Sequence, residues 1–238
     1  DFAFDVETTG IDPRRDRPLG IALTFADQRS YYIVFEHSVE DEDGTVRVRE
    51  FCSRDAVADL LRGLFAQETV TMVAHNAKFD LHFLQRLGLR VHGCLADTML
   101  AAKLVDENRD VDLKSLSRLV GMELVRFQDL PRYPGFPSDA FVGVPLEAAA
   151  TYAMADTEAT FRLWLALRAA LDEEGLTYAF SAIVMPLLPV LQQMEWRGIA
   201  FDAEQARTLL ANYEQMANDA YERIWQEGMR FLLDAYHR

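Results

Sequence analysis

The stretch from residue 2 to residue 12, FAFDVETTGID, constrains this chain more than any other part of it. It begins with apolar residues, as a strand buried on one face does, and then places Asp5 and Glu7 two positions apart. Side chains at i and i+2 of a strand project from the same face of the sheet. Two like charges on a mostly buried strand repel each other and lose hydration, so a divalent cation between them would relieve both costs. Oxygen ligands suit Mg²⁺ or Mn²⁺, although an Asp-x-Glu pair before a turn is also a common chance pattern.

The composition indicates a globular chain without a membrane span. At 238 residues, half of them hydrophobic, the chain is long enough for one or two domains with a substantial core. No apolar run approaches the length of a span, and no leader pattern precedes the first strand. The start inside a strand, without Met, is typical of a fragment. Cys52 and Cys94 lack a second pair for zinc, which favours a reduced intracellular setting.

The net charge bears on the kind of partner. The formal charge of −14 disfavours a general polyanion binder, because phosphate contacts need Lys and Arg. It does not exclude a metal-dependent nuclease, which needs acidic residues at its centre and only a few local cations to guide a strand.

Hydrophobic spacing and turn residues predict an α/β chain with a mixed sheet flanked by helices and the first strand at its centre. Residues 36–50 should form a charged loop, either a solvated hairpin tip or crossover or, through the acids at 40–43, a calcium site. Residues 131–145, rich in proline, should form an irregular loop. Further strands are expected at 18–25, 31–35 and 69–74, and helices at 53–65 (behind a Ser cap), 77–87, 98–105, 113–120, 146–171 and 178–195, with a long amphipathic helix after Asp202.

A second acidic position follows the strand at 69–74. Asn76 and Asp80 stand one helical turn apart at the start of the next helix. The free N–H groups of a helix N-terminus suit a phosphate, and Asp80 would then face the pocket of the strand carboxylates. Alternatively, Asn76 only caps the helix and Asp80 is a solvated acid of its first turn.

A third acidic position lies within the long helix. Tyr152 and Asp156 are spaced i and i+4, so they share one face of that helix. The surrounding alanines allow the helix to approach the sheet closely, which leaves Asp156 no easy route to water. The alternative is an ordinary core tyrosine beside an exposed aspartate.

Together these motifs resemble a known superfamily. A strand with DxE, a helix start with NxxxD and a later helix with YxxxD, in this order, are similar to the DEDD 3′–5′ exonucleases, which use a ribonuclease H-like fold. A tyrosine at 152 resembles the DEDDy subgroup. FDVETTGID, AHNAKFDLHFL, DTMLAAKLV, DLKSL and YAMADTEAT are similar to the proofreading domain of family A (polymerase I-like) DNA polymerases. PLLPVLQQMEWRGIAFD resembles the entry to the polymerase domain.

The resemblance implies the domain organisation and the chemistry. Residues 1–175 would be the exonuclease domain, and 176–238 the first, truncated thumb helices of the polymerase domain, so no nucleotide-adding site is expected. The exonuclease would release nucleoside 5′-monophosphates from a 3′ end by two-metal catalysis, for proofreading in replication and repair. The implied catalytic residues are Asp5, Glu7, Asp80, Tyr152 and Asp156, of which the four carboxylates would hold two Mg²⁺ or Mn²⁺ ions.

The resemblance also implies substrate contacts and partners. The partners would be a single-stranded or frayed 3′ end of DNA and the rest of the polymerase, with no membrane. Phe136 and Phe141 are guesses for the aromatics that stack on bases, and Lys78 and Arg109 could equally be solvated surface cations. His75 is interpreted as a helix-start or substrate-side hydrogen-bonding residue. The implied substrate-binding residues are Thr8, Ile11, His75, Asn76, Lys78 and Arg109.

Two other functions stay open at this stage. One is a silent exonuclease-like scaffold that braces a polymerase, which the complete acidic set disfavours. The other is a free-standing DEDDy exonuclease that trims RNA, which the polymerase-like tail disfavours. The expected location is the bacterial cytoplasm, and a phage or organellar origin is also compatible with the sequence.

Overall fold

A five-stranded mixed sheet in the order β3-β2-β1-β6-β7 forms the centre of the structure, a computed structural model that describes residues 1–236. β1 lies in the middle, antiparallel to β2 and parallel to β6, as the sequence predicts. The elements are β1 (Phe2–Thr8), β2 (Pro18–Phe25), β3 (Ser30–Val34), β4 (Glu36–Glu40), β5 (Val46–Glu50), α1 (Arg54–Phe65), β6 (Thr71–Ala74), α2 (Ala77–Arg86), β7 (Cys94–Asp97), α3 (Thr98–Val105), α4 (Leu113–Leu116), α5 (Leu146–Glu173), α6 (Thr177–Ala179), α7 (Met185–Arg197) and α8 (Ala203–Tyr236).

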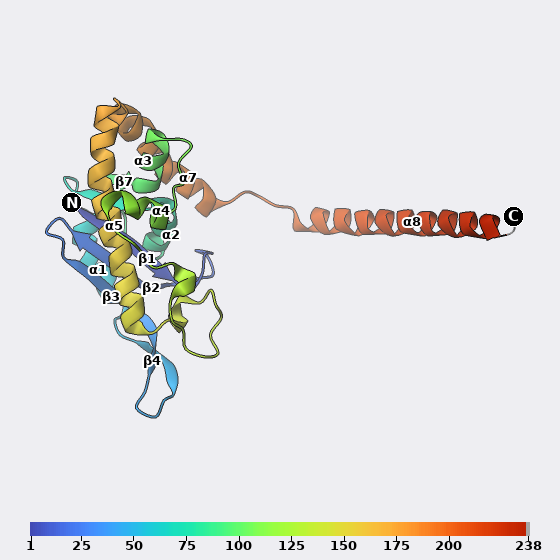
Figure 1. Cartoon of the computed structure of the whole chain (residues 1–238), viewed down its shortest axis with the longest axis horizontal. Helices are drawn as coiled ribbons and strands as arrows, with labels where there is room; N and C mark the ends of the chain where they lie inside the picture. Colours follow the sequence, from blue (N-terminus) through green and yellow to red (C-terminus); the bar gives the residue numbers. More distant parts are fainter. Residues whose placement is uncertain (237–238) are drawn as a thin grey trace. The chain divides into compact units, whose positions relative to one another are not determined.

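The two faces of the sheet are covered by different helices (Figure 1). Phe65 of α1 makes edge contacts with Phe2 and Phe4, at ring-centroid distances of 5.6 and 5.4 Å. On the opposite face the Thr24 hydroxyl of β2 donates a 2.8 Å hydrogen bond to Thr157 of α5. Because side chains alternate along β1, Asp5 and Glu7 point to the face that α5 covers.

The structure departs from the sequence prediction in several short segments. Residues 36–50 form a β4–β5 hairpin, and Arg47 and Arg49 both pair with Asp41 near its tip, which gives no support to a calcium site. The strand β7 was not predicted, because a pattern of four residues is too short to be recognised in the sequence. Its parallel pairing with β6 defines it as a strand. The predicted helix at 113–120 is α4 followed by a 3₁₀ turn, Ser117–Val120. Ser53 occupies the N-cap of α1 but makes no side-chain capping bond there.

The chain divides into two compact units, Asp1–Trp196 and the residues from Arg197 onward. α7 belongs to the first unit because Met185 and Leu188 are buried in the main hydrophobic core. The first unit therefore extends beyond the predicted domain limit at residue 175. The assignment of 176–238 to a polymerase domain stays a prediction.

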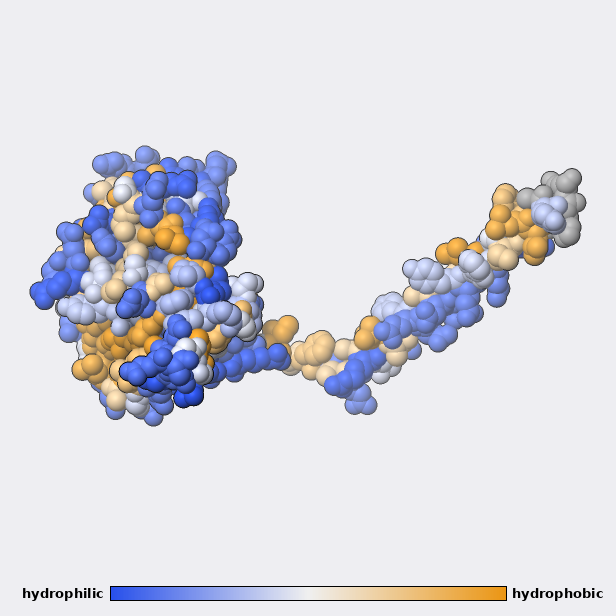
Figure 2. Space-filling model, turned by 60° about the horizontal axis from the view of Figure 1, so that its bottom comes forward, coloured by the Kyte–Doolittle hydropathy of each residue, from blue (hydrophilic) through white to orange (hydrophobic). Residues whose placement is uncertain are grey.

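The second unit consists mainly of α8. The Asp202 carboxylate accepts hydrogen bonds from the backbone N–H groups of Glu204 and Gln205, as expected for an N-cap. Apolar groups lie on one side of this helix and hydrophilic groups on the other (Figure 2). The predicted apolar stripe, which includes Leu210, Tyr213 and Met216, is exposed. In the part of the chain that the structure describes, no single helix has the length and apolar character of a membrane span. One bent pair of helices, Leu146–Glu173 with Thr177–Arg197, has the length and composition of a span when the two are taken together.

Candidate active site

Asp80 is held against the strand that carries the first two carboxylates. The backbone N–H of Val6, the residue between Asp5 and Glu7, donates a 2.9 Å hydrogen bond to Asp80 Oδ1. Asp80 is 1% exposed, so the alternative of a solvated first-turn acid is wrong. Asn76 begins α2 in the left-handed conformation, with φ 64°, and makes no side-chain cap bond. The fold thus places the acid of α2 at the centre of β1.

The long helix α5 adds Asp156 and Tyr152 to the same place. Asp156 is 7% exposed, which excludes the alternative of an exposed aspartate. The ring of Tyr152 lies 6.0 Å from that of Phe141 and 6.5 Å from that of Phe127, so aromatic contacts fix its position. The three segments that the sequence motifs identify therefore converge at one site.

Burial and mutual repulsion perturb every carboxyl group of this site. Burial, followed by the charge of Asp156, raises the pKa of Asp5 to about 7. Burial raises the pKa of Glu7 and of Asp80 well above their ordinary values, and the charge of Asp5 adds to both shifts. Burial also raises the pKa of Asp156 and of the Tyr152 phenol, which stays protonated at neutral pH. Such clustered shifts are typical of functional sites.

Lys114 is a member of the site that the sequence analysis missed. Its ammonium donates to both carboxylate oxygens of Asp156 and lies 4.1 Å from the centroid of the Tyr152 ring. Both partners of the ion pair are nearly buried, with side-chain exposures of 11% and 10%. Its positive charge opposes the rise in pKa of Asp5, Glu7 and Asp156. Only its place in the DLKSL motif could have pointed to it, because a lysine at the second position of a four-residue helix has no distinctive spacing.

The donor set suits a hard divalent cation. Four carboxylates supply only oxygen ligands, which Mg²⁺ and Mn²⁺ prefer. Glu7 Oε1 is buried and has no hydrogen-bond partner among residues 1–236, as expected for an oxygen whose partner is an ion. Across those residues no three acidic, histidine or cysteine side chains already form a metal cage. Both oxygens of Asp156 accept from Lys114, whereas only Oδ1 of Asp80 accepts from Val6.

Three of the predicted substrate-binding residues line one cavity of about 430 Å³, namely Ile11, Asn76 and Lys78. Ile11 is 86% exposed at its edge. Arg14 and Trp196, which the sequence analysis did not single out, also line this cavity.

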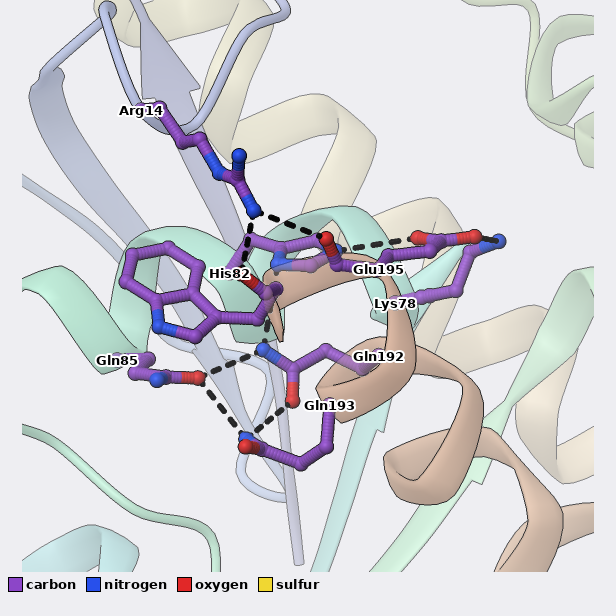
Figure 3. Close-up of polar contacts among 8 residues, drawn as sticks. Arg14, Lys78, His82, Gln85, Gln192, Gln193 and Glu195 are labelled. Atoms are coloured by element: carbon purple, nitrogen blue, oxygen red, sulfur yellow. Dashed lines mark hydrogen bonds and ion pairs between the residues drawn. The ribbon is translucent and has the colours of Figure 1, made fainter. Parts of the chain in front are cut away.

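A polar cluster joins α2 to α7 beside this cavity (Figure 3). Glu195 accepts hydrogen bonds from Lys78 at 2.7 Å and from His82 at 3.2 Å. The Arg14 guanidinium donates to the backbone carbonyls of Glu195 and Trp196. Lys78 is therefore an ion-paired side chain, and Glu195 uses both carboxylate oxygens within the protein.

The other predicted substrate-binding residues have local partners. The Thr8 hydroxyl donates to the Gly10 carbonyl at 2.7 Å, and Arg109 pairs with Asp106. His75 Nδ1 lies 2.8 Å from the Thr98 hydroxyl, and burial lowers the pKa of this histidine. Their roles in substrate binding stay predictions. Phe141 is 3% exposed inside a hydrophobic cluster, so the guess that it stacks on a base is wrong.

The fold and the acidic site define a class of protein. The family described as 3′–5′ exonuclease matches residues 1–172, so the chain belongs to that family and is a nuclease of the hydrolase class. The ribonuclease H-like sheet and the resemblance to exonucleases of polymerase I-like enzymes are thereby confirmed.

The relatives at the sequence level are DNA polymerases. The chain is 31% identical to DNA polymerase I of Treponema pallidum over 90% of its own length and 24% of the relative, and 33% identical to DNA polymerase I of Chloroflexus aurantiacus over 95% and 23%. It thus spans about a quarter of the length of these relatives. A DNA polymerase of Escherichia phage T5 is 27% identical over 94% of this chain, so the relatives include bacterial and phage proteins.

Solved structures support the fold. The POL domain of Pol1 from M. smegmatis, in complex with DNA primer-template and dNTP, superposes with a TM-score of 0.68 at 23% identity, covering 93% of this chain and 33% of that one. Brucella melitensis NrnC, solved with bound Mg²⁺, gives a TM-score of 0.60 at 23% identity, covering 83% and 85%.

Without metal, Asp5 should make the protein less stable as the pH rises from about 4 to about 7. The pKa of Asp5 is about 7 in the folded protein and 3.8 ordinarily, so in this range the folded state holds a proton that the unfolded chain has lost. The free energy of unfolding then falls with rising pH. Denaturant unfolding of the wild type and of Asp5→Asn at pH 5 and pH 8, in a chelator, measures this effect together with the part of the Glu7 and Asp80 shifts that the Asp5 charge causes, which has the same sign. The opposing contributions of His37 and His75 cancel in the difference. The prediction would be contradicted if the free energies of unfolding of the wild type and of Asp5→Asn differed by the same amount at both pH values.

Proposed function

We propose that this chain hydrolyses DNA from its 3′ end to nucleoside 5′-monophosphates, with two Mg²⁺ or Mn²⁺ ions held by Asp5, Glu7, Asp80 and Asp156. The observation that carries this proposal is the convergence of four carboxylates from β1, α2 and α5, the half-buried Asp5 and Glu7 and the buried Asp80 and Asp156, around one unpartnered Glu7 oxygen. When bound, the cations would supply a water of lowered pKa and neutralise charge on the phosphate and the leaving oxygen.

The electrostatics of the site suggest which carboxylates would hold which cation. The charge of Asp156 raises the pKa of Asp5, and the charge of Asp5 raises the pKa of both Glu7 and Asp80, so Asp5 is the central acid of the set that would hold the cations. Glu7 and Asp156 would complete one ion site. Asp80, which accepts a hydrogen bond from the backbone N–H of Val6, would hold the second ion.

Tyr152 is proposed to orient the attacking water without taking its proton. Burial, followed by the charge of Asp156, raises the pKa of its phenol above its ordinary value. A protonated phenol donates a hydrogen bond, so the general base must lie elsewhere. Lys114, which touches both Tyr152 and Asp156, would hold this pair in place.

Replacing Tyr152 with phenylalanine should lower kcat about tenfold to a hundredfold while leaving KM for a DNA strand nearly unchanged. The ring contacts with Phe127 and Phe141 persist in this variant, and only the hydroxyl is lost. Steady-state hydrolysis of a 3′-labelled oligonucleotide measures both constants. Full activity in the variant would remove the orienting role.

The strand itself is proposed to reach the carboxylates past the cavity that Ile11, Asn76 and Lys78 line. The exposed Ile11 would wedge against the last base, and Asn76 would bind near the scissile phosphate. Arg14 and Trp196 add a cation and an aromatic face of the kind that unpaired strands bind without sequence preference. Thr8, His75 and Arg109 stay candidates for further contacts. A mispaired primer frays more readily, which would give proofreading its selectivity.

Degradation of matched single-stranded DNA and RNA oligonucleotides in Mg²⁺ tests the proposal. We expect DNA to be shortened stepwise from the 3′ end, with mononucleotide products, and a chelator to stop the reaction. If only the RNA oligonucleotide were degraded, the chain would instead be an RNA-trimming exonuclease. Stable DNA and RNA in the presence of either cation would indicate a silent scaffold. The remainder of a polymerase I-like enzyme, in a bacterial or phage setting, is the partner that we infer for the chain.

A further inference from the structure

Tyr32 of β3 lies on the same face of the sheet as the catalytic candidates of β1. It pairs with Ala22 of β2, which in turn pairs with Asp5 of β1. Residues that are directly opposite each other on neighbouring strands project to the same side. Tyr32 therefore points to the α5-covered face, although nothing in its local sequence distinguishes it from its neighbour Tyr31.

Gly20 allows the Tyr32 side chain to extend toward Glu7. Gly20 is the partner of Glu7 in the β1–β2 register. A Cβ atom added to Gly20 would lie 2.6 Å from Cζ and 2.7 Å from the hydroxyl oxygen of Tyr32, closer than real atoms approach. The phenol thus occupies the space over Gly20 that a side chain would fill, beside Glu7.

Tyr32 and Glu7 present complementary polar atoms without partners. Within residues 1–236, the Tyr32 hydroxyl and Glu7 Oε1 are both buried and both lack a hydrogen bond. A buried donor and a buried acceptor left unpaired each cost free energy, and a hydrogen bond between them would remove both costs. Burial, followed by the charges of Glu7 and Asp5, raises the pKa of Tyr32, so its hydroxyl keeps its proton and can donate to a carboxylate.

We propose that Tyr32 is a positioning residue for Glu7 in cation binding. Its hydroxyl donates a hydrogen bond to the ionised Glu7 carboxylate, directly or through one buried water, and so fixes the orientation in which Glu7 holds a divalent cation. This inference rests on the proposed function. Partners of this kind, one shell away from a metal, orient the ligands that touch it.

The test is Mn²⁺ binding by Tyr32→Phe, measured by calorimetry without any nucleic acid. We expect the affinity to fall about tenfold, as is typical when such a partner is removed. The unfolding midpoint of the metal-free variant should be equal to or higher than that of the wild type, because the lost hydroxyl had no partner. Tyr31→Phe is the matched control: this adjacent tyrosine is 46% exposed and points the other way.

The outcomes separate this inference from the proposed function. Equal Mn²⁺ affinity in Tyr32→Phe and wild type would overturn the positioning role, and so would a lower unfolding midpoint with unchanged affinity. An equal loss of affinity in Tyr31→Phe would overturn it as well. A wild-type protein that neither binds Mn²⁺ nor cleaves DNA would overturn the proposed function and this inference with it.

Discussion

Asp5→Asn should reduce hydrolysis of a DNA strand by at least about a thousandfold, equivalent to roughly 4 kcal/mol of transition-state stabilisation. Asp5 is the carboxylate whose charge raises the pKa of both Glu7 and Asp80, so it is the one best placed to serve two cations. The amide keeps the size of the side chain but supplies no negative charge. A 3′-labelled oligonucleotide with Mg²⁺ measures the loss.

The variant should remain folded, because it removes a buried acid whose ionisation destabilises the metal-free protein. Asp172→Asn, an exposed aspartate at the end of α5, is the control and should keep full activity. Near wild-type rates in Asp5→Asn, at a matched protein concentration, would show that the assignment of the cation ligands is wrong. Asp156→Asn is a less clean test, since it leaves the Lys114 ammonium buried beside an amide.

Lys114→Met should destabilise the metal-free protein by about 3 kcal/mol or more, which is typical when one partner of a buried ion pair is removed. Its ammonium is the positive charge paired with Asp156, and it offsets repulsion at Asp5 and Glu7. Saturating Mg²⁺ should reduce this loss, because a dication neutralises the same carboxylates. Denaturant unfolding in a chelator and in Mg²⁺ measures both values.

Lys103→Met provides the comparison for this measurement. Lys103 is an exposed lysine of α3 that donates to the Glu107 carbonyl, so its loss should change the stability little in either condition. If Lys114→Met lost the same free energy with and without Mg²⁺, the ammonium and the cation would not act on the same carboxylates. The pair would then be a purely structural one.

Much of the site could be predicted because its motifs are local. The alternation in β1 gives the common face of Asp5 and Glu7, and the i, i+4 spacing gives that of Tyr152 and Asp156. Each motif alone had a plain structural alternative, which only the burial of Asp80 and Asp156 removes. The central position of β1 also followed from its need for cover on both faces.

The features that were missed depend on contacts between distant segments. The position of Lys114 beside Asp156 spans 42 residues, and the position of Tyr32 beside Glu7 depends on the register of three strands. β7 is defined by its pairing with β6, not by its own composition. The guess that Phe141 stacks on a base failed because its burial comes from contacts with distant segments, among them Leu19 and Ala149, which the composition of the loop does not show.

The missing side chain at Gly20 has an evolutionary consequence. Any other residue there would collide with the Tyr32 ring, so a single substitution at Gly20 would push the phenol away from Glu7. Either a turn of the Tyr32 side chain or a smaller residue at position 32 would relieve the collision, and both remove the phenol from Glu7. We therefore expect the two positions to co-vary among descendants of this chain, so that lineages which lose the glycine also lose the tyrosine.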